Sequence, residues 1–235
     1  MKSLEILKID QGDICNLSRL PIDVFLNPVY LTTKQILKNS NIKYQDTHLF
    51  SHYRIFSKKI RNLSDIFKIS ESSILDSYSY KSYFFPWYHE DIIDNFEDIA
   101  FIKERYKGFG SEQFEKIKLL IKSIQNTGYT PELYADRKHG HITGYWLSGV
   151  NGKRFYIVSG NHRASILCAM FPKDKIPVIY ERVKFMKSRD RNKCLFYNEH
   201  PSTFSIEDSD KWPSVVNGIV SNDIARKIFN AYVRE

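Results

Sequence analysis

Residues 156–170 read Tyr-Ile-Val-Ser-Gly-Asn-His-Arg-Ala-Ser-Ile-Leu-Cys-Ala-Met. The run from Tyr156 to Val158 is apolar, as in a buried strand, and the residues after Gly160 have the spacing of a helix with Cys168 on its apolar face. Glycine adopts backbone angles that other residues avoid, so Gly160 lets the strand turn sharply into the helix. The stretch therefore predicts a strand, a one-glycine turn and a helix that begins at Asn161.

The residues of this turn are typical of an anion-binding site. Asn161 or Ser159 can cap the helix, and the first-turn N–H groups and the helix dipole favour negative charge. Arg163 adds a planar, permanently charged group, and His162 exchanges protons near neutral pH. We expect Ser159, Gly160, Asn161, His162 and Arg163 to bind phosphate. The alternative is a purely structural turn whose two basic side chains point into water.

The composition is that of a globular protein with an anionic partner. The chain has 235 residues, of which 42% are hydrophobic and 26% are charged, and its formal net charge is +8. This length permits one large domain or two small ones. A positive surface attracts nucleic acid, nucleotides, phosphosugars and anionic membranes alike, so the charge by itself does not choose among them.

The cysteines and the hydropathy favour a cytoplasmic protein. Cys15, Cys168 and Cys194 are too far apart for a metal knuckle, and a reduced compartment fits them best. The N-terminus has no uninterrupted apolar segment, and no later segment approaches the length of a membrane span. We expect a cytoplasmic protein that does not span the membrane. Association with the inner face of the membrane is compatible with these features.

A second glycine-containing segment precedes the clearest helical pattern. Lys107-Gly-Phe-Gly110 predicts a flexible loop, and Ser111 predicts the N-cap of a helix that ends at Gly128. Two glycines before a helix are compatible with a second anion site. Lys107, Gly110 and Ser111 are therefore further candidates for phosphate binding.

The other elements predict a mixed α/β (α+β) fold. Strand patterns at 142–147 and 154–158 flank Asn151-Gly152, a strong hairpin signal, and residues 176–180 form another strand pattern. Helical patterns are expected at 33–38, from Ser64, at 91–106 and in a C-terminal helix capped by Ser221. The aromatic segment Tyr83–His89 is expected to pack in the core.

The order of these features resembles the ParB/sulfiredoxin-like superfamily. The resemblance is carried by the helix ending at Gly128, the hairpin, the Ser-Gly-Asn-His-Arg turn, the next helix and Ile-Pro-Val-Ile, over roughly residues 111–182. In that superfamily the equivalent turn holds nucleotide phosphates, and its members include partition proteins, sulfiredoxins and free-serine kinases. The resemblance implies a phosphate-binding core at 111–182, a packed N-terminal region at 1–110 and a basic, helical extension at 183–235.

The turn also departs from the named members. Partition proteins usually have Gly-Glu-Arg-Arg followed by a helix-turn-helix, and sulfiredoxins have a cysteine where this chain has Asn161. A narrower resemblance includes Phe84-Phe-Pro-Trp87, His141-Ile-Thr-Gly-Tyr-Trp-Leu147 and Trp212-Pro-Ser-Val-Val-Asn-Gly218. These segments are similar to uncharacterised ParB-like proteins encoded among bacterial cell-surface polysaccharide genes, which implies a role in sugar processing.

The first functional hypothesis is a transferase. Its donor would be a nucleotide or a sugar pyrophosphate such as phosphoribosyl pyrophosphate, accompanied by Mg²⁺, and its acceptor a sugar, a polysaccharide or another hydroxyl compound. Either a phosphoryl or a glycosyl group could be transferred. Such chemistry requires positive charge at the leaving phosphate and a base at the acceptor. Arg163, Lys107 or Arg137 would supply the charge, and His162, His139 or His141 the base. His139 and His141 lack a third convergent ligand, so we expect no metal site there.

Two other hypotheses remain open. Residues 182–193 carry six basic residues against one acidic residue, which suits a ParB-like protein that binds nucleotides and nucleic acid. No reading helix or base-stacking motif accompanies that charge. A non-catalytic scaffold would instead use the aromatic N-terminal half as an interface and would not bind a phosphorylated small molecule.

The charge pattern generates a prediction about DNA. Diffuse positive charge provides salt-sensitive attraction without base recognition, so duplex DNA should bind weakly and without sequence preference. A titration with duplexes of different sequence at physiological salt measures this. Tight, sequence-dependent binding would instead favour the nucleic-acid hypothesis over the transferase.

Overall fold

The computed structural model describes residues 6–16, 22–59, 61–70, 72–79, 82, 84–88, 92, 97–131, 140–180 and 202–233. For residues 16, 22, 55–59 and 97–107 only the backbone is described. The strands are β1 (Leu7–Ile9), β2 (Ile14–Asn16), β3 (Ile22–Asp23), β4 (Thr143–Ser148), β5 (Lys153–Ser159), β6 (Ile176–Tyr180) and β7 (Thr203–Ser205). The α-helices are α1 (Pro28–Lys38), α2 (His48–Lys59), α3 (Leu63–Phe67), α4 (Ser73–Ser77), α5 (Glu97–Thr127), α7 (Asn161–Met170), α8 (Pro213–Val216) and α9 (Asn222–Val233). The short 3₁₀ helices are η1 (Gln11–Asp13), η2 (Val24–Leu26), η3 (Tyr44–Asp46) and η5 (Ile206–Lys211).

The described strands form one mixed, open sheet. Its order is β1-β6-β4-β5-β2-β3, and β7 also pairs with β4. The hairpin of β4 and β5 is antiparallel and pairs Thr143 with Ser159 and Ser148 with Lys153, as the sequence predicted. β6 and β7 are both parallel to β4 and pair with its beginning and its end, respectively. The mixed α/β class is therefore confirmed.

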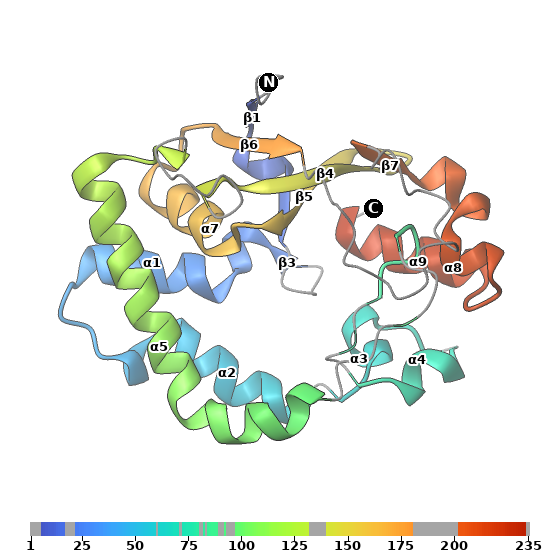
Figure 1. Ribbon diagram of the computed structural model, residues 1–235, viewed down its shortest axis with the longest axis horizontal. Coiled ribbons are helices and arrows are strands. Elements are labelled where there is room, and N and C mark those ends of the chain that lie inside the picture. The colour runs from blue at the N-terminus through green and yellow to red at the C-terminus, as the bar shows by residue number, and fades with distance from the viewer. Residues whose placement is uncertain are drawn as a thin grey trace.

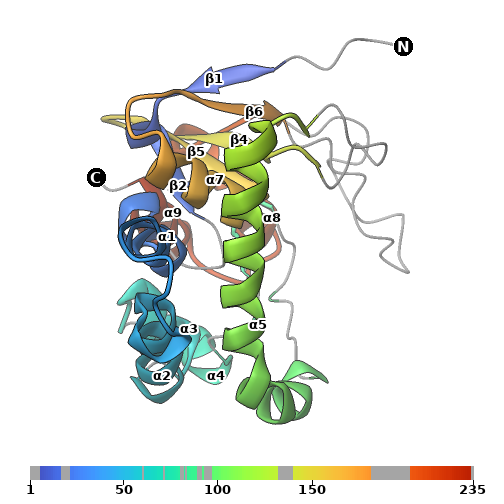
Figure 2. The same ribbon diagram turned by 90° about the vertical axis from the view of Figure 1, so that its left-hand side faces the viewer.

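Helices extend away from one side of the sheet (Figures 1 and 2). α7 carries the chain from β5 to β6, α1 packs on α7, and α2 packs on α1. The long helix α5 runs beside this stack and contacts α7, α1 and α2 in turn. No helix in the described part of the chain is both long and apolar enough to cross a membrane.

An aromatic cluster joins the N-terminal and C-terminal segments to the sheet. Trp87 is fully buried, and its indole N–H donates to the Tyr145 hydroxyl of β4 at 3.1 Å. Its ring lies 5.1 Å from Phe229 and 5.7 Å from Tyr232, both on α9. Tyr145 stacks on Tyr156 of β5 at 5.2 Å. The prediction that the aromatic segment packs in the core is confirmed for the described residues.

The region around residues 107–110 is helical, contrary to the prediction from the sequence. These residues lie inside α5, so the predicted loop and the predicted N-cap at Ser111 are wrong. The Ser111 hydroxyl donates to the Gly108 carbonyl oxygen within the helix at 2.7 Å. A side chain at Gly110 would overlap the ring of Tyr44. This position therefore requires glycine because α5 packs closely against η3, and not because the chain turns here. That packing offsets the cost of about 1 kcal/mol for each glycine inside a helix.

Two other boundaries in the structure differ from those predicted from the sequence. α1 begins at Pro28, five residues before the predicted start, because Asn27 caps it by accepting from the Val29 N–H at 2.7 Å. The expected division between residues 110 and 111 falls inside α5. β1, β2 and β3, all from the region 1–110, belong to the same sheet as the hairpin. The N-terminal region therefore contributes to the core sheet as well as packing on it.

Gly144 allows a close contact between β4 and β5 in the hairpin. A Cβ atom at this position would overlap the Tyr156 carbonyl oxygen and would lie 2.7 Å from the Phe155 ring. We predict that Gly144→Ala lowers the free energy of unfolding by about 3 kcal/mol or more, because the β5 backbone has to move. Gly152→Ala is the matched control, since nothing lies within 4 Å of its added Cβ. Equal denaturation midpoints for the two variants would contradict the prediction.

Candidate phosphate-binding cleft

The predicted turn lies at the junction of β5 and α7. Gly160 has φ 93° and ψ 21°, in the left-handed region that favours glycine. A Cβ atom here would lie 2.9 Å from Ile142 Cα and 3.3 Å from the His141 carbonyl oxygen. The turn therefore requires glycine for its backbone angles and also for its close contact with the segment leading into β4.

The first turn of α7 has no side-chain cap. Gly160 occupies the N-cap position, and its carbonyl oxygen accepts from the Ala164 N–H at 2.9 Å. The prediction that Asn161 or Ser159 caps the helix is wrong, because the residue at the cap position has no side chain. The uncapped N–H groups of the first turn are the kind of donors that bind anions.

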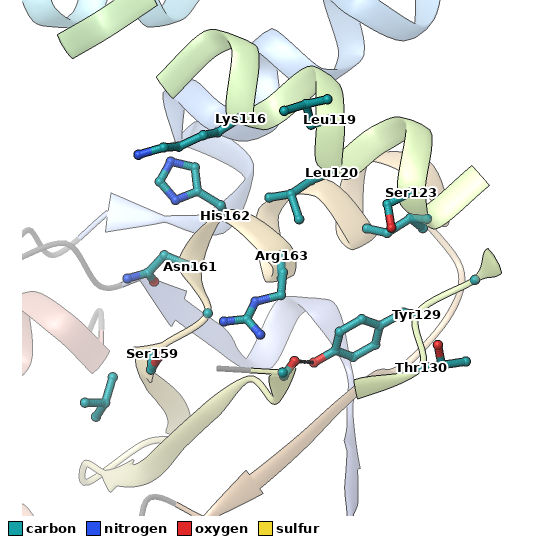
Figure 3. Close-up of a pocket in the computed structure, with 15 residues that line it drawn as sticks. Lys116, Leu119, Leu120, Ser123, Tyr129, Thr130, Ser159, Asn161, His162 and Arg163 are labelled. Carbon is teal, nitrogen blue, oxygen red and sulfur yellow. Dashed lines mark hydrogen bonds between the residues drawn. The ribbon is translucent and has the colours of Figure 1, made fainter. Parts of the chain in front are cut away.

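This turn opens onto a cleft of about 950 Å³ between α7 and the C-terminal half of α5 (Figure 3). The residues that line it are Lys116, Leu119, Leu120, Ser123, Ile124, Gly128, Tyr129, Thr130, Gly140, Val158, Ser159, Gly160, Asn161, His162 and Arg163. All five residues predicted from the turn are in this set. The structure thus brings them together around one concave surface.

The end of the cleft at α7 is positively charged. Lys116 extends from α5 beside the His162 ring, and the Arg163 guanidinium projects into the cleft (Figure 3). No Asp or Glu is among the described lining residues. Burial lowers the pKa of His162 below its ordinary value, and the positive charges of Lys116 and Arg163 lower it further. The neutral form of His162 is therefore favoured in the unliganded cleft.

The other part of the cleft is largely apolar. Leu119, Leu120 and Ile124 come from α5, and Leu119 is 66% exposed. Tyr129 follows α5, and its hydroxyl donates to the Gly140 carbonyl oxygen at 3.0 Å and accepts from the Ile142 N–H at 3.1 Å. This part of the cleft suits the carbon-rich portion of a ligand.

Other predicted site residues lie elsewhere. His141 is only 5% exposed and does not line the cleft, so the structure does not support a catalytic contact for it. Gly110 and Ser111 lie within α5 and are also absent from the lining. The side chain of Lys107 lies outside the described residues, as do Arg137, His139 and the basic segment 182–193.

Lys116 and Tyr129 were missed by the sequence analysis. Lys116, Leu119, Leu120 and Ser123 have the spacing i, i+3, i+4 and i+7, which is a second stripe on α5 beside the buried one. That stripe was a usable signal, because it places a basic residue and two leucines on one helix face. No comparable signal marked Tyr129.

Comparison with known proteins gives no relative. No family model, curated protein or solved structure matches this chain. Within the described ranges, no group of three or more His, Cys, Asp or Glu side chains could hold a metal ion.

Tyr129 connects the end of α5 to the segment beneath the Gly160 turn. Tyr129→Phe removes both hydrogen bonds and leaves the Ile142 N–H without this acceptor. We predict a loss of about 1–3 kcal/mol in the free energy of unfolding. Tyr180→Phe, at a partly buried position on β6, is the control. The stability of both variants is measured from their denaturation midpoints. A Tyr129→Phe midpoint equal to that of the wild type would show that the two hydrogen bonds of Tyr129 contribute nothing to stability.

Proposed function

We propose that the protein is a transferase that binds a phosphorylated donor in this cleft, with the donor phosphate at the N-terminus of α7. The observation that carries the proposal is the convergence of Lys116, His162, Arg163 and uncapped helix N–H groups at one end of a cleft whose described lining has no carboxylate. Positive charge of this kind stabilises a leaving phosphate.

The shape of the cleft supports a donor with two parts. A volume of about 950 Å³ is at the upper end of the range of roughly 300–1,000 Å³ typical of small-molecule sites. The phosphates of a nucleotide or of a sugar pyrophosphate would lie at the charged end. The base or sugar would pack against Leu119, Leu120 and Tyr129. Both donor classes satisfy these constraints.

The chain's own residues suggest how transfer would proceed. Arg163 and Lys116 would hold the donor phosphates, and the turn around Gly160 would fix their position. His162 exchanges protons near neutral pH, so its unprotonated imidazole could accept a proton from an acceptor hydroxyl. The acceptor class we propose is a sugar or another hydroxyl compound. The described lining offers Mg²⁺ only neutral oxygen ligands, so Mg²⁺ would be bound mainly by the donor phosphates and would neutralise their charge.

The ParB/sulfiredoxin-like fold is part of this proposal. The order of hairpin, Gly160 turn, helix and strand agrees with the resemblance drawn from the sequence, and the phosphate position would be the one the resemblance implies. Involvement in the synthesis of bacterial cell-surface polysaccharide follows from the narrower resemblance alone. We include it as the context in which acceptors should be sought.

A thermal-shift screen tests donor binding. Nucleotides, nucleotide sugars and phosphoribosyl pyrophosphate, each with and without Mg²⁺, are added to the full-length protein. A true donor at a hundred times its Kd should stabilise the fold by about 2.7 kcal/mol. Consumption of that donor in the presence of sugar acceptors then measures transfer.

The matched variants are Arg163→Ala and Lys122→Ala. Arg163→Ala should weaken donor binding by about tenfold to a hundredfold, because a charge-assisted hydrogen bond is lost. Its melting temperature without ligand should stay near that of the wild type. Lys122→Ala removes an exposed cation of α5 that does not line the cleft and should bind donor normally. Donor binding unaffected by Arg163→Ala would reject the proposed site.

A further inference from the structure

His162 lies between two cations in the cleft. Lys116 approaches its ring from α5, and Arg163 follows it directly on α7 (Figure 3). No acidic side chain is among the described residues that line the cleft. A protonated His162 would therefore be the third positive charge in a small volume, and the unliganded protein disfavours that state.

The described elements that pack on α7 supply little negative charge near His162. α1, η2 and β6 also pack on α7. η2 and β6 contain no Asp, Glu, Lys, Arg or His, and α1 contributes only Lys34 and Lys38. On α5, Glu115 forms an ion pair with Lys118 at 3.5 Å, and Glu112 is exposed. The described charges that act on His162 are thus both positive.

An entering anion reverses this balance. A doubly charged phosphate placed among Lys116, Arg163 and the α7 N–H groups would neutralise the two cations and attract a proton to His162. A singly charged phosphate would leave the site with excess positive charge and would attract the proton less. The cleft therefore responds to the charge of its ligand as well as to its shape.

Building on the proposed function, we propose that the cleft selects a doubly charged terminal phosphate over a singly charged phosphodiester. His162 is the residue that makes this selection, because it takes up one proton from solvent as the phosphate binds. No covalent bond forms or breaks in this step. The donor class is then a compound that ends in a phosphate or pyrophosphate. The bound imidazolium would first give its proton to the leaving group, and the neutral imidazole so formed would be the base that accepts the proton of the acceptor hydroxyl.

The sign of the pH dependence follows from this proton uptake. Free His162 has a lowered pKa, and the bound anion raises that pKa. Affinity should increase as the pH falls through the pKa of the bound state and should level off below the pKa of the free state. Between these limits the affinity changes by up to about tenfold per pH unit.

Sulfate is a suitable probe, because it keeps two negative charges throughout the pH range 5.5 to 8, whereas phosphate itself titrates there. Methyl sulfate has a similar head group and one charge. Binding of both to the full-length protein is measured by calorimetry across this range, together with the NMR titration of the His162 ring with and without sulfate. We expect tighter sulfate binding at lower pH, a raised His162 titration midpoint with sulfate, and weaker, less pH-dependent binding of methyl sulfate.

His162→Gln keeps a polar side chain but cannot take up the proton. In this variant sulfate affinity should become independent of pH, and the preference for sulfate over methyl sulfate should shrink. His48→Gln, at an exposed position on α2, is the control and should retain the wild-type pH dependence. Sulfate binding that is equally tight at every pH, or a pH dependence that persists in His162→Gln, would overturn the inference while leaving the phosphate site intact. If neither sulfate nor pyrophosphate bound at any pH, the proposed function itself would fail.

Discussion

The candidate site depends on the close contact between Gly160 and Ile142. Ile142 Cα lies where a side chain on residue 160 would have to go, so the turn can sit directly on the segment leading into β4. The Ile142 carbonyl oxygen accepts from the Ile179 N–H of β6 at 2.9 Å, and its N–H donates to the Tyr129 hydroxyl. One residue thus ties together the sheet, the end of α5 and the turn before α7. These contacts fix both walls of the cleft relative to each other.

This arrangement places two cations beside a histidine. Lys116 and Arg163 both act unfavourably on the protonated form of His162, and no carboxylate is among the described residues that line the cleft. The supporting elements can bear this cost, since α7 is buried from Ala164 to Ala169 and α5 contributes buried residues from Phe114 to Ile124. A site held in this way is preorganised for an anion, because its groups need not move together when the ligand binds.

The aromatic cluster explains why the chain forms one connected core. Trp87 contacts Tyr145 of β4 and both Phe229 and Tyr232 of α9, so segments distant in sequence share one buried surface. Each large ring removes a large apolar area from water, and edge-to-face contacts add to that gain. β1 and β2 extend the same sheet from the N-terminal side. The resulting scaffold supports the elements that form the cleft.

The amino-acid sequence by itself determined the elements whose signals are local. The strand patterns on either side of Asn151-Gly152 specified the hairpin. The glycine between an apolar strand and a helix specified the turn at 160 with its five candidate ligands. These features follow from backbone preferences and short-range periodicity, which need no knowledge of distant residues.

Only the tertiary structure decided which distant residues join that turn. The glycines at 108 and 110 looked like a loop, yet Gly110 is required by the ring of Tyr44, a contact over more than 60 positions that leaves no local signal. In the same way, Lys116 and Tyr129 line the cleft because α5 packs beside α7. His141 lies close to the Gly160 turn in space but is buried and does not line the cleft. Local preferences select strands, turns and helices, but burial and electrostatic environment depend on packing between elements, and packing determined the charge and the walls of the cleft.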